Sequence, residues 1–157
     1  MSPDRLTDDR ATRDAHHTPE PVAIRRPRRR LAQHAPSFVV QAHAALRFHH
    51  DLRLERGGVL VSWAVPKGVP TEAGGRNRLA VETEDHPLEY AAFEGTIPAG
   101  EYGAGDVVRY DHGSYELLRW DEREVKVVLH GARLEGTYVL IHTDARNWLL
   151  HKMDASP

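Results

Sequence analysis

The sequence predicts an all-β protein, folded as an antiparallel barrel or sandwich behind an extended or disordered N-terminal arm. From Ser37 onward, apolar residues recur with a period of two in short runs, which is typical of strands. Gly, Pro, Asp or Asn separates most of these runs, as turns require. After the arm, no window of about 12 residues carries a convincing helical stripe. Short strands at this spacing are typical of antiparallel barrels and sandwiches.

Residues 1–36 are predicted to form a flexible basic arm, and residues 37–157 the folded domain. The arm holds five of the ten prolines and lacks apolar periodicity. It carries eight arginines against five acidic residues, so its net charge is +3, which leaves −5 for the rest of a chain whose total is −2. We expect such a segment to be extended or disordered unless it docks on the domain or on a ligand.

A dense run of arginines lies in this arm. Five arginines fall within six residues around Pro27: Arg25, Arg26, Arg28, Arg29 and Arg30. Such a run binds nucleic-acid phosphates without reading sequence, and the binding weakens as salt rises. The alternative interpretation is a solvated tail that contacts nothing.

Composition excludes several classes of protein. The 157 residues suit one domain with a tail. The absence of cysteine excludes disulfides and thiolate metal sites. No apolar run approaches the roughly 20 residues that cross a bilayer, and the polar N-terminus lacks a signal-peptide core. We therefore expect a soluble, cytoplasmic protein with no membrane partner.

The folded domain divides into nine predicted strands. Their residue ranges are 38–41, 46–55, 59–65, 79–83, 106–110, 114–118, 125–129, 137–142 and 148–152. Gly57 and Gly58 predict a hairpin turn between the second and the third.

The strand over residues 46–55 carries the clearest chemical signal. Its predicted core face consists of Leu46, Phe48, His50, Leu52 and Leu54. Its opposite face consists of Arg47, His49, Asp51, Arg53 and Glu55. Imidazole and carboxylate together suit Mn²⁺, Fe²⁺ or Zn²⁺, and a neighbouring guanidinium suits a phosphate. His43 has the same parity as His49 and is a candidate third ligand, whereas an ordinary solvent-facing strand is the simpler alternative.

Two further positions need comment. His50 falls on the apolar face, which predicts a buried histidine with a backbone partner. Residues 84–90 hold His86 and Tyr90, and Pro87 favours an extended backbone at His86. A loop there would aim both side chains into a cleft, while a plain surface turn is the alternative. The glycine-rich segment 93–103 is interpreted as architectural.

Several segments in the right order resemble one known family over nearly the whole chain. They are FVVQAH (38–43), FHHDLRLE (48–55), SWAVPKG (62–68), EDHPLEY (84–90), FEG (93–95), GEYG (100–103), WLL with Lys152 near the C-terminus, and, upstream, Arg13-Asp14 with TPEP (18–21). Together they resemble the 3′-phosphoesterase domain of bacterial DNA ligase D and its stand-alone relatives.

This resemblance implies a compact β-barrel with a polar, crescent-shaped groove. It implies a Mn²⁺-dependent activity, with Co²⁺ or Zn²⁺ as alternative metals, at the 3′ end of the primer strand in a DNA or DNA/RNA primer-template that carries a 3′ ribonucleotide or 3′-phosphate. Family members remove a 3′-terminal ribonucleoside and then the remaining 3′-phosphate, which leaves a 3′-hydroxyl for end joining. The implied partners in trans are an end-joining ligase or polymerase and Ku, and the implied location is the cytoplasm at the nucleoid.

The resemblance also assigns residues. It implies metal ligands at His43, His49 and Asp51. It implies phosphate-contacting catalytic roles for Arg53 and His86, with His86 as acid or charge stabiliser, and a supporting role for Tyr90. It places basic residues near the site at Lys67 and Arg78, and residues needed for part of the activity at Arg13, Asp14 and Glu20. At His50 the chain departs from the family, where tyrosine is usual.

Two other functions fit parts of the pattern. Two histidines and a carboxylate on a β-barrel also describe mononuclear iron oxygenases, in which case His142 would be the distal ligand. A non-catalytic barrel that binds single strands is the second alternative, because aromatic side chains stack on bases. The polar face of residues 46–55 lacks aromatic rings other than imidazole, which disfavours that alternative.

Overall fold

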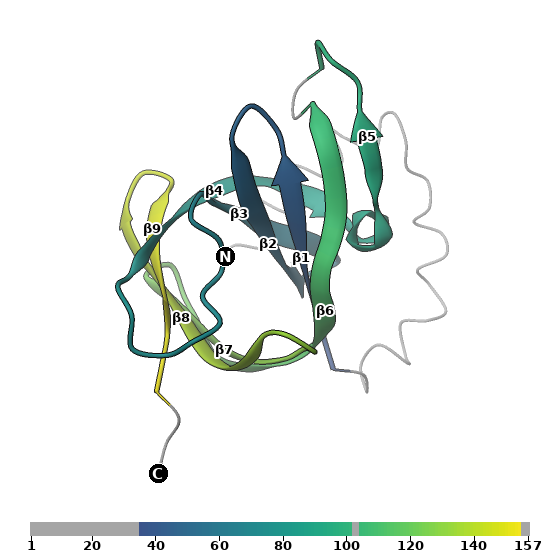
Figure 1. Cartoon of the computed structure of the whole chain (residues 1–157). Helices are drawn as coiled ribbons and strands as arrows, with labels where there is room; N and C mark the ends of the chain where they lie inside the picture. Colours follow the sequence, from purple (N-terminus) through teal and green to yellow (C-terminus); the bar gives the residue numbers. More distant parts are fainter. Residues whose placement is uncertain (1–34, 102–103, 155–157) are drawn as a thin grey trace.

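The computed structural model describes residues 35–101 and 104–154, which form a closed antiparallel β-barrel (Figure 1). The strands are β1 (Ser37–Ala44), β2 (Phe48–Arg56), β3 (Val59–Val65), β4 (Arg78–Pro87), β5 (Gly95–Ile97), β6 (Gly105–Trp120), β7 (Glu124–His130), β8 (Glu135–Asp144) and β9 (Asn147–Lys152). A short 3₁₀ helix, η1 (Leu88–Ala92), follows β4. Among these residues, no helix is long and apolar enough to span a bilayer.

The order of strands explains the closure. The sheet runs β1-β2-β3-β4-β9-β8-β7-β6, and β6 pairs back with β1, while β5 adds to the edge of β6. At this seam a Cβ on Gly105 would lie 2.1 Å from the carbonyl oxygen of Ala44, so only glycine permits the approach. The predicted all-β antiparallel barrel is thus confirmed. The arm predicted over residues 1–36 lies outside the described residues except for its last two positions.

Two strands that the sequence predicts separately form a single strand in the structure. Residues 106–110 and 114–118 both belong to β6, and the intervening residues, expected to turn, stay extended. The reason is long-range pairing: the first half of β6 pairs with β1 and the second half with β7. The sequence pattern does not predict β5 either, because this strand is only three residues long.

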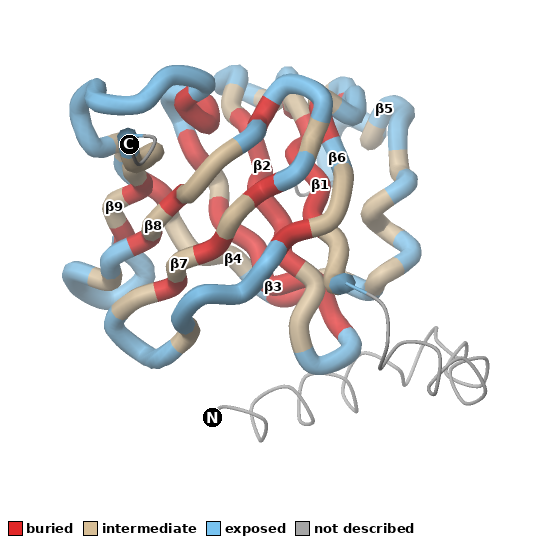
Figure 2. Tube along the Cα trace, turned by 90° about the horizontal axis from the view of Figure 1, so that it is seen from below, coloured by how far each residue is buried: buried red, intermediate tan, exposed pale blue. Residues whose placement is uncertain are grey.

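The interior of the barrel is filled by one face of the strands, and on β1, β2 and β3 the opposite face is largely buried as well. Buried residues recur along the strands between half-buried and exposed ones (Figure 2). The core includes Phe38, Val40, Leu52, Leu54, Val61, Trp63, Val127, Leu140 and Leu150. Leu52 and Leu54 therefore face the core as predicted. Leu46 and Phe48 do not, because the tip of the β1–β2 hairpin extends beyond the core, and they are 99% and 59% exposed.

The turn between β7 and β8 is held by Asp111 of β6. Its carboxylate accepts hydrogen bonds from the backbone N–H groups of Ala132, Arg133 and Leu134 at 3.0, 2.9 and 2.8 Å. Burial raises the pKa of Asp111, but the backbone hydrogen bonds outweigh burial, and the net shift of the pKa is downward. The ionised form therefore stabilises the fold.

We expect Asp111→Asn to lower the free energy of unfolding by about 1.5–3 kcal/mol near neutral pH, the usual worth of hydrogen bonds to a charged group. Because the folded-state pKa is lowered, this stabilisation is present above the unfolded pKa of about 3.9 and is lost as pH falls through the folded pKa. Urea unfolding of the wild type and of Asp111→Asn at about pH 7 and about pH 2.5 measures the difference between their free energies of unfolding. A difference that is as large in acid as at neutral pH would contradict this account.

Candidate active site

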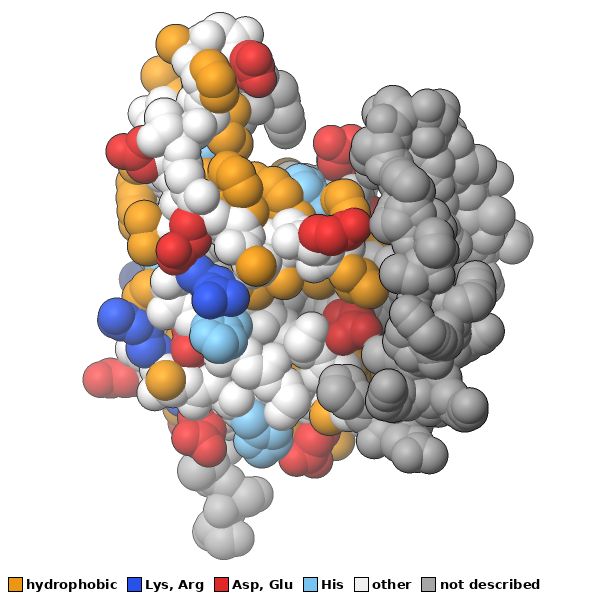
Figure 3. Space-filling view, turned by 90° about the vertical axis from the view of Figure 1, so that its right-hand side faces the viewer, with side chains coloured by type: hydrophobic (Ala, Val, Ile, Leu, Met, Phe, Trp, Pro, Cys, Tyr) orange, Lys and Arg blue, Asp and Glu red, His pale blue; other side chains and the backbone are white. Residues whose placement is uncertain are grey.

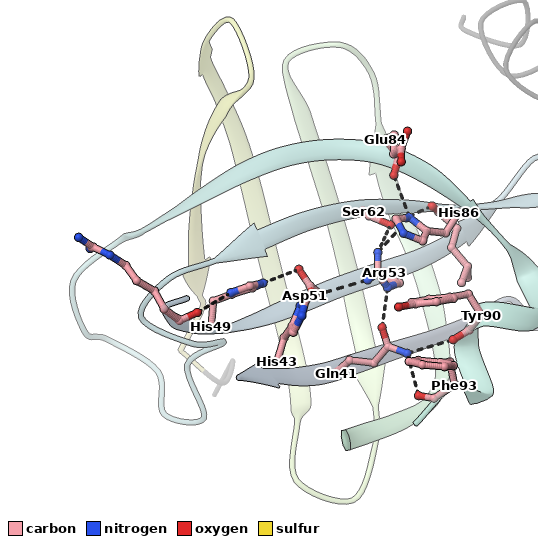
Figure 4. Close-up of polar contacts among 12 residues, drawn as sticks. Gln41, His43, His49, Asp51, Arg53, Ser62, Glu84, His86, Tyr90 and Phe93 are labelled. Carbon is pink, nitrogen blue, oxygen red and sulfur yellow. Dashed lines mark hydrogen bonds and ion pairs between the residues drawn. The ribbon is translucent and has the colours of Figure 1, made fainter. Parts of the chain in front are cut away.

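Three potential metal ligands meet on the face of the sheet opposite the core. His43 pairs with His49 across β1 and β2, and Asp51 follows two residues later on the same face. The carboxylate of Asp51 lies 3.2 Å from His43 Nδ1 through one oxygen and 3.2 Å from His49 Nε2 through the other (Figure 4). One ligand atom from each residue lies within 4.8 Å of the others. The predicted triad is thus brought together.

The donor set fits a divalent transition metal. Two imidazoles and a carboxylate suit Mn²⁺, Fe²⁺ or Zn²⁺ and leave coordination positions open. His49 also approaches the carbonyl oxygen of Arg47 through Nδ1 at 3.1 Å. If that nitrogen donates its proton, Nε2 is left to face the centre of the triad, which is how second-shell bonds orient metal-binding histidines.

The charges in the triad reinforce one another. The hydrogen bond to Asp51 is the main cause that raises the pKa of His49, against the opposing effect of burial. Burial raises the pKa of Asp51, but the bond from His49 and the charge of Arg53 outweigh it and lower the pKa. Asp51 is therefore ionised at neutral pH, as a metal ligand must be.

Arg53 is fixed beside the triad by neutral partners. Its Nε donates to Gln41 Oε1 at 2.8 Å, and one terminal nitrogen donates to Ser62 Oγ at 2.9 Å. The other terminal nitrogen lies 3.6 Å from Asp51 Oδ2. Burial lowers the pKa of Arg53, and the carboxylate of Asp51 counteracts that effect. A buried, pre-organised guanidinium next to an acidic metal ligand is suited to gripping a phosphate.

His86 and Tyr90 complete the cluster from β4 and η1. His86 Nδ1 lies 3.2 Å from a terminal nitrogen of Arg53 and 3.0 Å from the carbonyl oxygen of Glu84. The rings of His86 and Tyr90 are 4.8 Å apart, and the guanidinium of Arg53 lies 4.9 Å from the Tyr90 ring. Burial raises the pKa of Tyr90, so its hydroxyl stays protonated near neutral pH. His86 is extended, as Pro87 predicted, but it belongs to a strand rather than a loop.

Sequence reasoning missed two positioning residues. Gln41 is fully buried; besides accepting from Arg53, it donates through Nε2 to the carbonyl oxygens of Tyr90 and Phe93 at 3.0 and 3.2 Å. It thereby ties η1 to the face that carries Arg53. Ser62 on β3 is likewise fully buried. The sequence could have indicated Gln41, because it lies two residues before His43 on the same strand and therefore on the same face.

Of the remaining predicted residues, Lys67 and Arg78 lie near His50, and the others lie outside the described residues. Arg78 donates to the carbonyl oxygens of Lys67 and Gly68 at 3.0 and 2.9 Å, and Gly68 packs against His50. His50 is 8% exposed and accepts the backbone N–H of Val69 at 3.0 Å, which confirms its predicted structural role. The residues Arg13, Asp14 and Glu20 and the five arginines Arg25, Arg26, Arg28, Arg29 and Arg30 lie outside the described part of the chain.

His142 is placed away from the triad. Its ring nitrogens lie 3.1 and 2.7 Å from the carbonyl oxygens of Glu122 and Ala145, and its ring stacks on Trp148. Within the described residues, His142 does not belong to the group of potential metal ligands. The geometry therefore gives no support to a site that uses His142 as a distal iron ligand.

Sequence comparison decides the family. A family model described as the DNA Ligase D 3′-phosphoesterase domain matches residues 41–142. The chain belongs to this family. The chain is 51% identical over 96% of its length to the multifunctional non-homologous end joining protein LigD of Mycolicibacterium smegmatis, of which it covers 21%.

Two further relatives agree. The chain is 51% identical, over 96% of its length, to the multifunctional non-homologous end joining DNA repair protein LigD of Mycobacterium tuberculosis strain CDC 1551, of which it covers 20%. It is 46% identical, over 89% of its length, to LigD of Pseudomonas aeruginosa, of which it covers 17%. The chain thus spans about a fifth of the curated relatives it matches, and the family itself is described as a 3′-phosphoesterase domain.

Proposed function

We propose that this domain is a Mn²⁺-dependent 3′-end-processing enzyme. It removes a 3′-terminal ribonucleoside and then the 3′-phosphate from primer-template ends, and leaves a 3′-hydroxyl. The observation that carries the proposal is the shared role of Asp51, whose carboxylate contacts both histidines and also lies 3.6 Å from the guanidinium of Arg53. A metal-ligand set and a phosphate-binding cation thus adjoin one another.

The triad supplies the metal site, and a divalent cation bound there would supply Lewis-acid chemistry and lower the pKa of coordinated water. Arg53 binds the non-bridging phosphate oxygens and stabilises the charge that develops on them. His86, within reach of the same guanidinium, either protonates the leaving oxygen or adds positive charge. Tyr90 packs against both side chains, with its ring 4.8 Å from that of His86 and 4.9 Å from the guanidinium of Arg53.

The proposal includes substrate contacts outside the triad. In the space-filling view of the side that carries η1 and β5, hydrophobic side chains gather on the upper half of the face, Lys and Arg side chains lie below them at one edge, and acidic side chains are spread over the whole face (Figure 3). We include Lys67 and Arg78 as substrate contacts, with Arg13, Asp14 and Glu20 contributed by the N-terminal segment. The arginine run would bind duplex phosphates non-specifically. The proposed partners in trans are an end-joining ligase, a polymerase and Ku, at the nucleoid.

A labelled primer-template that ends in a 3′ ribonucleotide tests the proposal. With Mn²⁺ we expect shortening by one nucleoside to a 3′-phosphate, followed by conversion to a 3′-hydroxyl, both visible as shifts on a denaturing gel. A chelator should abolish both steps, and Mn²⁺ or Co²⁺ should restore them. An all-DNA primer with a 3′-hydroxyl is the control and should stay intact. Tight binding with unchanged strand length would instead favour the non-catalytic nucleic-acid-binding barrel.

A further inference from the structure

Apolar side chains stay exposed where β1, β2 and β6 project beyond the rest of the barrel (Figure 1). Phe48 lies beyond the last pairing of β2 with β3, which joins His50 to Val65. Val108 precedes the part of β6 that pairs with β7. The core side of this sheet therefore continues past the strands that cover it elsewhere. Phe48 and Val108 are 59% and 55% exposed, and Leu46 in the hairpin turn is 99% exposed.

The strand register joins these side chains into one surface. Phe48 pairs with Ala44, and Ala42 pairs with both His50 and Val108, so two adjacent rows lie on the same face. We call this surface the end patch, which consists of Ala42, Ala44, Leu46, Phe48 and Val108. Single exposed apolar residues are common on proteins, but contiguous apolar patches with a polar border mark interaction sites.

The end patch faces away from the triad. Successive side chains alternate along a strand, so Ala42 and Phe48 point opposite to His43 and His49. The ring of Phe48 meets His50 on the core side, with ring centroids 5.9 Å apart. A partner bound to the end patch therefore leaves the triad face uncovered, and the surface is independent of the proposed chemistry.

Positive charge borders the end patch. His50, at the base of the patch, lies 4.5 Å from Tyr110 between ring centroids. The exposed Arg133 places its guanidinium 4.7 Å from the centre of the Tyr110 ring. Arg78 donates to the carbonyl oxygen of Gly68, and Gly68 packs against His50. Two guanidinium groups thus lie around the base of the patch.

The balance of charge and the side-chain types favour one kind of occupant. The register places one carboxylate, that of Asp106, beside Ala44, where it accepts a hydrogen bond from Thr96 Oγ1 at 2.7 Å. The two guanidinium groups outweigh it, so a second copy of this chain would bring two positive borders together. Residues 1–36, with a net charge of +3, carry the same sign. Nucleobases stack on rings, whereas four of the five side chains in the end patch are aliphatic.

We propose that the end patch is the docking site for an acidic segment of a partner protein, which packs large apolar side chains on Phe48 and Val108. The apolar contacts form the dry centre of the interface and supply most of the affinity. Carboxylates of the partner lie opposite Arg133 and Arg78, where they orient the segment and speed its association.

The test begins with a phage-displayed library of random linear peptides, selected on the wild-type chain and counter-selected on Val108→Ser. We expect the enriched peptides to be acidic and to carry several large apolar residues. A fluorescein-labelled copy of the most enriched peptide is then titrated by anisotropy. Phe48→Ser and Val108→Ser should each weaken binding about 10-fold or more. Arg133→Glu should slow association and reduce its dependence on salt.

Leu118→Ser is the matched control, because Leu118 is also an exposed apolar residue of β6, at 51%, and lies outside the patch. It should bind the peptide like wild type, and thermal unfolding checks that every variant folds. Two apolar positions are tested because Phe48 adjoins the candidate ligand His49, whereas Val108 does not.

Several results would overturn the proposal. They are a selection that enriches no sequence, enriched peptides that are basic, and peptides that bind Val108→Ser or Phe48→Ser as tightly as wild type. If oligo(dT) binding is lost in Val108→Ser while peptide binding is kept, a nucleic acid occupies the surface. If sedimentation shows a dimer that Val108→Ser disrupts, the occupant is a second copy. Failure of the proposed function shows separately, as peptide binding by a chain that does not process 3′ ends.

Discussion

Replacing Asp51 with asparagine should abolish 3′-end hydrolysis, with a loss on the order of 10³-fold or more. Asparagine keeps the size of the side chain but loses the charge that both histidines and Arg53 contact. It also removes the main cause that raises the pKa of His49. Metal affinity should fall by more than the roughly 10- to 100-fold typical of losing a second-shell partner.

Calorimetric titration with MnCl₂ and the primer-template assay measure the two effects of Asp51→Asn. The matched control is Glu116→Gln, because Glu116 also bonds a histidine, with 2.7 Å between its Oε2 and His130 Nε2, but on the exposed surface. We expect Glu116→Gln to keep both metal binding and activity. An Asp51→Asn protein that binds Mn²⁺ as tightly as wild type would refute the metal assignment.

Replacing Arg53 with lysine should reduce the rate of phosphate hydrolysis about 10²- to 10³-fold while metal affinity changes only a few-fold. Lysine keeps the positive charge, but it lacks the planar fork that reaches Gln41, Ser62 and His86 together. The Oε1 of Gln41 loses its donor in this variant, which adds a cost of about 1–3 kcal/mol in stability if it stays buried and unsatisfied, whereas Ser62 Oγ keeps its hydrogen bond to the carbonyl oxygen of Leu60.

Parallel measurements of kcat, Mn²⁺ affinity and thermal unfolding distinguish these contributions for Arg53→Lys. Arg119→Lys is the control, since Arg119 also donates through Nε, in its case to the carboxylate of Asp121 at 2.9 Å, but is largely exposed. We expect it to leave all three quantities nearly unchanged. If Arg53→Lys weakened Mn²⁺ binding as much as Asp51→Asn, Arg53 would act on the ligand set and not on the phosphate.

Part of the site could be predicted from the sequence because side-chain direction in a strand is local. Alternation along residues 46–55 placed His49, Asp51 and Arg53 on one face, and parity added His43 from the preceding strand. The order of several short motifs identified the family, and the run of period-two segments predicted an all-β fold. These signals depend only on neighbours in the chain, so the sequence alone contains them.

Other features depend on contacts between distant segments. The register of β1 against β2 sets His43 opposite His49, and the end of β4 brings His86 to Arg53 across 33 residues. Gln41 is a positioning residue because it bonds to the backbone of η1, and Ser62 is one because it accepts a hydrogen bond from Arg53. The residue types alone suggested neither role.

The sequence by itself therefore determined the fold class, the family and the residues of the triad. Only the tertiary structure decided that Arg53 is buried among neutral partners, that β6 is continuous, and that Leu46 and Phe48 leave the core. The physical reason is that alternation fixes which way a side chain points, whereas strand pairing and barrel closure fix what it meets there.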